Sequence, residues 1–410
     1  MLNKENQREL AYVVIVDDVT PIDGYDRVEL AHVGGWTIVV GKGEFRPGDP
    51  AIYFEIDSKL PEVEPFTNME FLTKKHYKIK TQKMCKSISQ GLLMSAEQFG
   101  WHIVPKCEPL YSTPYIVDNE SHDHHIENES RFLTAALGVT YAEPSDNQRK
   151  AAAADKYKRM AQRNGKLFSH QPFRWLMKRT WGKKLLFIFF GKKKDKRGWP
   201  SWVTKTDEER IQNMPWILTD KNEWIATEKI DGTSTTFTMK RRKGFKKNDF
   251  YICSRNVVFD KPDKKCFYET NVYTEMAEKY HIEEKLTKLL KEYPEAEWIT
   301  IQGETYGEGI QKRDYSMKEH NFMAFNLIMS NTGRWNSVDM AKKLIDYGIP
   351  SIPIVDEHFI LPDTVDELLD YATGKSAVDG GMREGIVFRY KDGSKSFKAV
   401  SNEFLLKFHQ

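Results

Sequence analysis

Short apolar runs separated by turn residues fill the first hundred positions of the chain. The runs cover 10–16, 27–33, 36–40 and 51–56, and the pairs Asp-Gly, Gly-Gly and Pro-Gly stand between them. Runs of β-branched and aromatic residues that end in such turn chemistry predict β-strands. Several short strands with tight turns favour a small β-barrel.

The apolar spacing becomes helical in two later stretches. An alanine-rich segment, 151–163, follows Ser145 and predicts a helix opened by a capping serine. In 272–293 the apolar residues, Met276, Leu286 and Leu290 among them, recur at helical spacing and predict a helix that packs on a core.

Composition sets limits on the class of protein. A length of 410 residues predicts two or three domains. No segment approaches the roughly 20 apolar residues of a membrane span, and the first residues lack a secretion signal. Four cysteines form no Cys-x-x-Cys pair, which favours reduced thiols in a cytoplasm. The histidines at 122, 124 and 125 have no partner cluster, so a solvated loop is preferred over a metal site.

A net charge of +3 conceals a strong asymmetry. Between Arg149 and Arg197 about 17 Lys or Arg oppose two acids, and aromatic residues are interleaved with them. Cations with rings attract phosphates and unstacked bases, so we favour a nucleic-acid contact. Two alternatives stay open: a solubilising arm whose rings form a core, and an apolar run, 185–190, that either touches an anionic membrane surface or forms a strand.

The most informative chemistry lies in Lys229-Ile230-Asp231-Gly232. On a strand, residues two apart point to one face, so this spacing predicts that Lys229 and Asp231 lie together. A lysine beside a metal-coordinating acid can lose its proton and attack phosphorus, which leaves a covalent lysine phosphoramidate. A single match of this kind also occurs by chance.

Further patterns follow in the order that a nucleotidyl transferase requires. They are Ser254-Arg255-Asn256, 301–307 (IQGETYG), 322–326 (FMAFN), 383–388 (REGIVF) and 396–400 (SFKAV). With them, residues 200–410 resemble the covalent nucleotidyl transferases, which include polynucleotide ligases and capping enzymes. Gly303-Glu304, Gly309-Ile310-Gln311-Lys312 and Phe404-Leu405-Leu406-Lys407 look like the RNA ligase 2 family.

The N-terminal part carries a second resemblance. Residues 36–45 and 53–58 are similar to the OB-fold domain that precedes the transferase domain in RNA ligases of the Deinococcus and Naegleria types. The expected fold class is therefore α+β. It comprises an OB-like barrel at 1–145, a basic aromatic linker at 146–198 and an antiparallel-sheet nucleotidyltransferase domain at 199–410. We expect no room for the C-terminal OB domain of DNA ligases and capping enzymes.

The resemblance implies catalytic roles for the motif residues. Lys229 would attack the α-phosphorus of ATP, with its pKa lowered by Mg²⁺ and by Lys398. Lys398 would neutralise the α-phosphate, and Arg255 would bind the ribose or a 5′-phosphate. The expected ligands of hydrated Mg²⁺ or Mn²⁺ are Asp231, Glu304 and Glu384.

Nucleotide contacts are implied for a further set of residues. Phe325 would stack on adenine, although a buried strand residue is the alternative. Glu228, Thr227 or the adjacent main chain would read the adenine edge. Ser234 stands where the phage member of the RNA ligase 2 family has asparagine, and its hydroxyl can still serve the sugar.

One position departs from the family pattern. The better-known members carry a second lysine two residues after Lys398, and here that position is Val400. Lys395 or Lys407 could substitute, or one lysine could suffice.

The resulting hypothesis is an ATP-dependent RNA ligase that seals 3′-OH/5′-phosphate nicks in an RNA duplex or RNA/DNA hybrid, as a cytoplasmic monomer without a membrane partner. The alternatives are a GTP-dependent capping-type guanylyltransferase and a non-catalytic RNA-binding protein.

Overall fold

The computed structural model describes residues 1–3, 7–104, 115–118, 132–142, 165–168, 170–190, 198–244, 246–259 and 271–408. Two compact units result: 1–141 together with 199–410, and 142–198. The helix expected at 151–163 and the histidines at 122–125 lie outside the described residues. No helix in the described part of the chain has the length and apolar character that a bilayer crossing requires.

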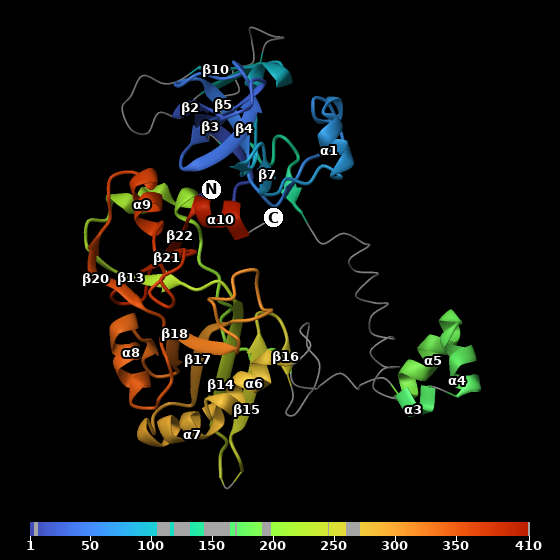
Figure 1. The fold of residues 1–410 in the computed structure, drawn as a ribbon, viewed down its shortest axis with the longest axis vertical. Helices are drawn as coiled ribbons and strands as arrows, with labels where there is room; N and C mark the ends of the chain where they lie inside the picture. The colour runs from blue at the N-terminus through green and yellow to red at the C-terminus, as the bar shows by residue number, and fades with distance from the viewer. Residues whose placement is uncertain are drawn as a thin grey trace. The chain divides into compact units, whose positions relative to one another are not determined.

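The N-terminal part of the first unit is built from short antiparallel strands (Figure 1). In β4 every second residue is buried, starting with Trp36, as expected of a strand with one face on a core. Two apolar cores lie here, one around Phe54 and Phe66 and one around Trp36 and Tyr53. The sheets are β1 (Ala11–Ile15), β5 (Pro50–Phe54) and β9 (Leu92–Met94); β2 (Asp18–Pro21), β3 (Val28–Val33) and β4 (Trp36–Gly41); β6 (Ser58–Lys59) with β12 (Thr140–Tyr141); β7 (Gln82–Met84) with β8 (Ser87–Ser89); and β10 (Trp101–Val104) with β11 (Tyr115–Asp118).

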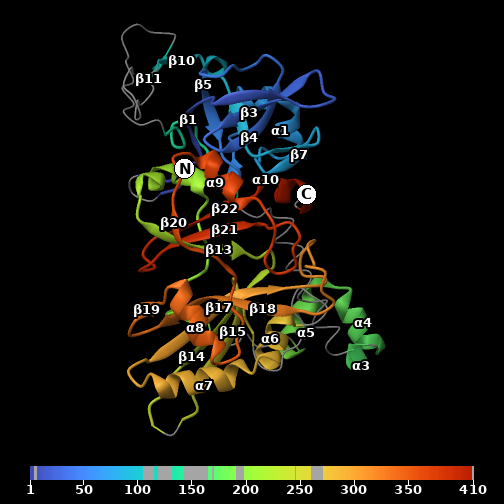
Figure 2. The same ribbon diagram turned by 60° about the vertical axis from the view of Figure 1, so that its left-hand side comes forward.

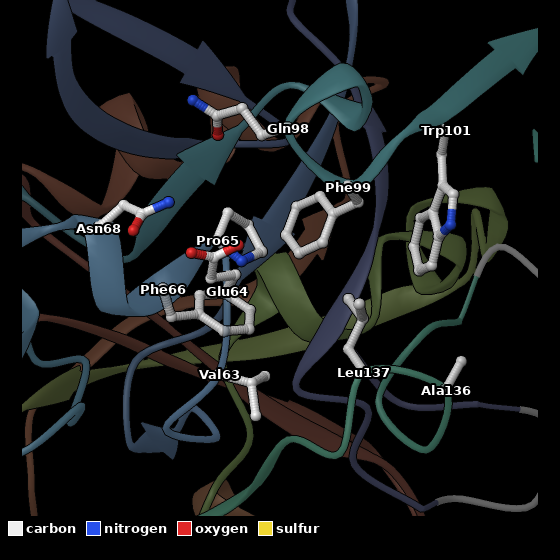
Figure 3. A pocket seen from close by; sticks show the side chains of 10 residues that line it. All are labelled: Val63, Glu64, Pro65, Phe66, Asn68, Gln98, Phe99, Trp101, Ala136 and Leu137. Atoms are coloured by element: carbon white, nitrogen blue, oxygen red, sulfur yellow. The ribbon is translucent and has the colours of Figure 1, made fainter. Parts of the chain in front are cut away.

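The four predicted strands of this region are confirmed to within two residues, whereas β2, β6, β7, β8 and β9 were not predicted. Short helices complete the domain: η1 (Phe66–Asn68), α1 (Glu70–Lys74) and η2 (Ala96–Phe99). A pocket of about 460 Å³ opens beside the rings of Phe99 and Trp101, whose centroids are 5.4 Å apart (Figure 3). All residues that line this pocket come from 63–137, so it is separate from the lysine motif.

The C-terminal part of the first unit contains two antiparallel sheets (Figure 2). The four-stranded sheet has the order β20 (Ile354–Ile360), β13 (Glu223–Lys229), β21 (Gly385–Tyr390), β22 (Ser396–Val400). The six-stranded sheet has the order β16 (Val258–Phe259), β15 (Asp249–Ser254), β14 (Thr233–Lys240), β17 (Trp298–Tyr306), β18 (Asn321–Met329), β19 (Gly333–Arg334). Because β13 ends at Lys229 and β14 begins at Thr233, the lysine motif crosses from one sheet to the other.

Helices cover these sheets with their apolar sides. The core of the six-stranded sheet includes Leu286 and Leu290 of α7 and Met340 of α8, and that of the four-stranded sheet includes Leu368 of α9. The bounds are α6 (Val272–Lys279), α7 (Ile282–Glu292), α8 (Ser337–Ile345), α9 (Val365–Ala372) and α10 (Asn402–Phe408), with η3 (Ile211–Asn213) and η4 (Pro215–Thr219) ahead of β13.

The single helix predicted for 272–293 is wrong in one respect, because it is two helices. His281 has a left-handed φ of 49° between α6 and α7, and this conformation interrupts the helical backbone. The prediction that these residues pack on a core is confirmed.

The second unit forms a small helical group, with α3 (Gly165–Phe168), α4 (Gln171–Met177) and α5 (Thr180–Phe190). Residues 185–190 therefore belong to a helix and not to a strand. Phe168 and Leu186 are buried in a cluster that several other rings join. Some aromatic residues of the basic segment therefore form a core, as the alternative of a solubilising arm predicts.

Candidate active site

Lys229 lies at the end of β13 and forms a close ion pair. Its Nζ is 2.6 Å from Glu384 Oε1, and the exposed fractions of the two side chains are 26% and 8%. Asp231 follows the strand end, so the prediction that Lys229 and Asp231 lie on one strand is wrong. The two residues still interact, since the Asp231 charge is among those that act on the pKa of Lys229.

Two glycines permit this close packing. A Cβ on Gly232 would lie 2.4 Å from the carbonyl oxygen of Thr305, and one on Gly385 would lie 2.2 Å from that of Ala399. Real side chains do not come so close to backbone oxygens. The glycines after Asp231 and Glu384 are therefore required where the two sheets meet and where β21 lies against β22.

The negative charges of three carboxylates, Asp231, Glu304 and Glu384, act on Lys229. Burial, with the charge of Glu384 adding to it, raises the pKa of Asp231 to about 7. Burial is also the main cause that raises the pKa of Glu304 to about 8, against the opposing charge of Lys229. Glu384 Oε2 is buried and has no hydrogen-bond partner in the described part of the chain.

This donor set fits a hard divalent cation. Crowded carboxylates and an orphaned oxygen call for positive charge, and oxygen ligands suit Mg²⁺ or Mn²⁺. Among the described residues no group of three or more His, Cys, Asp or Glu encloses a metal position by itself. Magnesium keeps several waters and commonly takes one or two carboxylates plus phosphate oxygens, so an open arrangement is compatible with it.

The two lysines of the site differ in the direction of their pKa shifts. Burial acts to lower the pKa of Lys229, but Glu384 and Glu304 outweigh it and raise the value. Burial, aided by the charges of Lys229 and Arg210, lowers the pKa of Lys398 to about 8. The protein groups alone therefore raise the pKa of Lys229, and the lowering expected from Mg²⁺ together with Lys398 stays a prediction. A cation on the three carboxylates would take over the role of the Lys229 ammonium and remove the cause of this rise.

The position of the missing second lysine is apolar. Val400 is buried against Ile88 and Leu405 in a cluster shared by the two parts of the first unit. Lys395 pairs with Asp220 at 2.8 Å, and Lys407 lies on α10 with its ammonium 5.2 Å from the Phe408 ring centre.

Sequence reasoning missed Arg210, a second cation beside Lys398. The backbones of Arg210 and Lys398 form a parallel bridge, and Arg210 Nη1 is buried without a partner among the described residues. The Arg210 charge acts on Lys398, and that of Glu384 acts on Arg210.

A segment ahead of β13 lies against several of the predicted residues. Asp207 pairs closely with Arg255, and its Oδ1 is 3.8 Å from Lys398 Nζ. Thr206 Oγ1 is 2.9 Å from the predicted sugar ligand Ser234. The structure thus brings Arg255, Ser234 and Lys398 to one acidic segment that the sequence analysis did not single out.

The Glu228 side chain is held by hydrogen bonds from a neighbouring loop. Its carboxylate is buried and accepts hydrogen bonds from the Ser376 hydroxyl and, at 2.8 Å, from the Ala377 amide. Burial raises the pKa of Glu228. The role of Glu228 in reading adenine stays a prediction, as do the roles of Thr227, which donates to the Val387 carbonyl at 3.2 Å, and of the adjacent main chain.

Phe325 on β18 is half-buried beside a cluster that includes Ile230 and Tyr315. The Arg389 guanidinium carbon is 5.8 Å from the centre of its ring. Part of the ring thus packs on the core, and part is accessible.

The loop between β17 and β18 holds the lysine motif through two side chains that sequence reasoning left without a role. The Asp231 amide donates to the Tyr315 hydroxyl at 2.7 Å, and Gln311 Nε2 donates to the Gly232 carbonyl at 2.8 Å. Gln311 stood in a recognised motif, but nothing in the spacing of Tyr315 pointed to this contact.

Comparison with known proteins agrees with this geometry. Residues 222–407 match the family model described as RNA ligase, and residues 10–96 match a model described as an OB-fold domain. No curated protein matches the chain.

Solved structures of a Naegleria gruberi RNA ligase resemble nearly the whole chain. The structure with PPi is 26% identical, covers 98% of this chain and 99% of that one, and has a TM-score of 0.59. Two variants of that enzyme, one with AMP and Mn and one with ATP and Mn, are each 25% identical with a TM-score of 0.60. They cover 98% and 97% of this chain and 99% of theirs. The expected α+β fold, with an OB-fold domain ahead of an antiparallel-sheet domain, is confirmed.

Proposed function

Since residues 222–407 match the RNA ligase family model and residues 10–96 match an OB-fold domain, we propose that this chain uses ATP to seal 3′-OH/5′-phosphate nicks through a covalent lysyl-AMP on Lys229. The observation that carries the proposal is the partly buried Lys229 ammonium, which is paired with Glu384 and acted on by the charges of Glu304 and Asp231. The substrate class is a nicked RNA duplex or RNA/DNA hybrid.

The first step forms a P–N bond. Lys229 Nζ, without its proton, attacks the α-phosphorus of ATP, the bond to the bridging oxygen breaks, and pyrophosphate leaves. Lys398, with Arg210 beside it, stabilises the charge that grows on the α-phosphate oxygens. Asp231, Glu304 and Glu384 would hold a divalent cation, which would supply positive charge beside the phosphates and Lys229.

The next two steps transfer and release AMP. A 5′-phosphate oxygen of the nick attacks the AMP phosphorus, the P–N bond breaks, and Lys229 regains its proton. The 3′-hydroxyl then attacks the 5′-phosphate, which forms the phosphodiester and releases AMP. Arg255 exchanges Asp207 for a phosphate of the substrate, because a planar guanidinium matches phosphate oxygens.

The proposal also assigns the remaining roles. Phe325 stacks on adenine, Ser234 contacts the ribose, and Glu228, Thr227 or the adjacent main chain reads the base edge. Residues 1–145 bind the nucleic acid, 146–198 form a basic arm, and 199–410 carry the chemistry. Cys85 and Cys253 are free thiols among the described residues, which supports a reducing, cytoplasmic setting.

Label transfer tests the proposal. The purified protein is incubated with Mg²⁺ and α-labelled ATP or, separately, α-labelled GTP, and then run on a denaturing gel. We expect label from ATP on the wild type and on Lys240→Ala, a control on β14, but not on Lys229→Ala. Label only from GTP would assign the chain to the capping class, and no label on folded protein free of AMP would leave an RNA-binding protein.

Sealing is measured next on nicked duplexes that differ only in the 3′ residue. Joining of a 3′ ribonucleotide in preference to a 3′ deoxynucleotide is expected. Equal joining of both contradicts the assignment as an RNA ligase while leaving the lysyl-AMP step intact.

A further inference from the structure

The helical group at 165–190 exposes rings that its own core does not need. Phe168 and Leu186 form its buried core, whereas the exposed fractions of Trp175 and Trp181 are 50% and 53%. The two indoles contact each other edge to face, with centroids 6.1 Å apart. An exposed tryptophan pair on so small a core calls for a partner outside the group.

One cation lies on an indole ring, and others are exposed in the same segment. The Arg179 guanidinium carbon lies 3.8 Å from the centre of the Trp175 ring. Arg174, Lys178 and Lys184 are exposed on the same two helices, and residues 165–190 contain no Asp or Glu. A surface with rings and uncompensated positive charge is complementary to a polyanion that also offers flat apolar faces.

We propose that α4 and α5 bind the unpaired strand of an RNA substrate, with bases stacked on Trp175 and Trp181 and phosphates on the neighbouring cations. Unstacked bases pair with aromatic rings without regard to sequence, and Arg adds a cation–π contact. This inference rests on the proposed RNA ligase function, for which it names the partner of the basic arm. The group contains none of the residues assigned to nucleotidyl transfer.

An anionic lipid surface is the competing partner. The exposed side of α5 continues from Trp181 through Leu185, Ile188 and Phe189, at spacings that keep these side chains on one face. Charge favours both partners equally. The tryptophan pair, with Arg179 against the Trp175 ring, favours RNA as the partner. Stacking and cation–π contacts bind a base more specifically than they bind an acyl chain.

Binding is measured with the full-length protein on two RNA probes by fluorescence anisotropy. One probe is a nicked duplex, and the other is the same duplex with a single-stranded tail. We expect the tail to tighten binding by the wild type and by Trp216→Ala, a control whose side chain is 40% exposed on the ligase part. In Trp175→Ala/Trp181→Ala the gain should be lost, roughly fivefold or more for each base unstacked. Trp175→Phe/Trp181→Phe should restore most of it.

A charge variant provides the second readout. Replacement of Arg174, Lys178 and Lys184 by glutamine should reduce the slope of log K against log salt for the tailed probe by about 2. ATP labelling should be unchanged in all of these variants, so a failure of this inference is distinguishable from a failure of the proposed reaction. An unchanged tail effect in the tryptophan variant, or an unchanged salt slope, overturns the proposal.

Flotation with phosphatidylcholine vesicles, with and without phosphatidylglycerol, separates the lipid alternative. Binding to the anionic vesicles that Ile188→Ser abolishes, together with a tail effect that the tryptophan variant retains, contradicts the RNA assignment and points to a membrane surface.

Discussion

The cationic side chains of the ligase site are paired with carboxylates, whereas the helical group at 165–190 contains no acidic residue to pair with its own cations. In the site, Lys229 is paired with Glu384 and Arg255 with Asp207. The helical group has cations on α4 and α5 and no acidic residue. The contrast separates two uses of charge: a site whose cations are held in place by carboxylates until a nucleotide or metal replaces them, and a surface that is open to a polyanion.

The largest effects should come from the carboxylates that hold Lys229. Glu384→Gln or Glu304→Gln should lower the rate of lysyl-AMP formation by about 10²–10³, because each removes negative charge that orients the lysine and binds the cation. Single-turnover label transfer measures this, with Glu308→Gln as an exposed control on the adjacent loop. A rate near that of the wild type in both variants would show that the carboxylates are structural.

Lys398 should show its lowered pKa when ATP binds. At a pH slightly above 8 much of Lys398 is neutral in the free protein, and phosphate charge raises its pKa, so binding should take up a proton. Titration calorimetry in buffers of different ionisation enthalpy measures the uptake. Lys398→Met should lose it and slow lysyl-AMP formation by roughly 10². Identical proton uptake in the variant would assign the titration to another group.

Stability should depend on pH in the direction set by the raised carboxylate pKa values. Asp231 and Glu304 bind protons more tightly when folded, with pKa values of about 7 and about 8. The stability they contribute is fully present below the unfolded pKa, near 4, and is lost as the pH rises through 7–8. Without metal, Tm should therefore fall by several degrees between pH 6 and pH 8.

Magnesium should reverse this loss, so its effect on Tm should be larger at pH 8 than at pH 6. Glu304→Gln should flatten both dependences. A Tm of the metal-free wild type that rises over this range contradicts the raised pKa values of Asp231 and Glu304.

Asp207→Asn should produce the smallest change. Both side chains of the Asp207–Arg255 pair are more than half exposed, so the loss of the pair should change the free energy of unfolding by less than about 1 kcal/mol. Freed from its partner, Arg255 should bind nicked RNA up to about fivefold more tightly. Anisotropy on the nicked probe measures this, and a weaker affinity would indicate that Asp207 positions Arg255 for the substrate.

The sequence predicted those features of the fold and the site that depend on residues close together in the chain. The N-terminal strands follow from alternation and turn residues, and the glycines of the K-x-D-G and E-G motifs coincide with backbone approaches that exclude a Cβ. Arg210, Asp207 and Tyr315 were missed because their contacts join segments far apart in the sequence. Propensity also could not show that His281 divides one helical pattern into two, since a single left-handed residue leaves the apolar spacing unchanged.

The central claim is that Lys229, and not the more easily deprotonated Lys398, carries the nucleotide. Peptide mapping by mass spectrometry after incubation with ATP and Mn²⁺ tests it directly. We expect one AMP on the peptide that contains Lys229 and none on the peptide that contains Lys398. An AMP on Lys398, or on no lysine of a protein that still seals nicks, would contradict it.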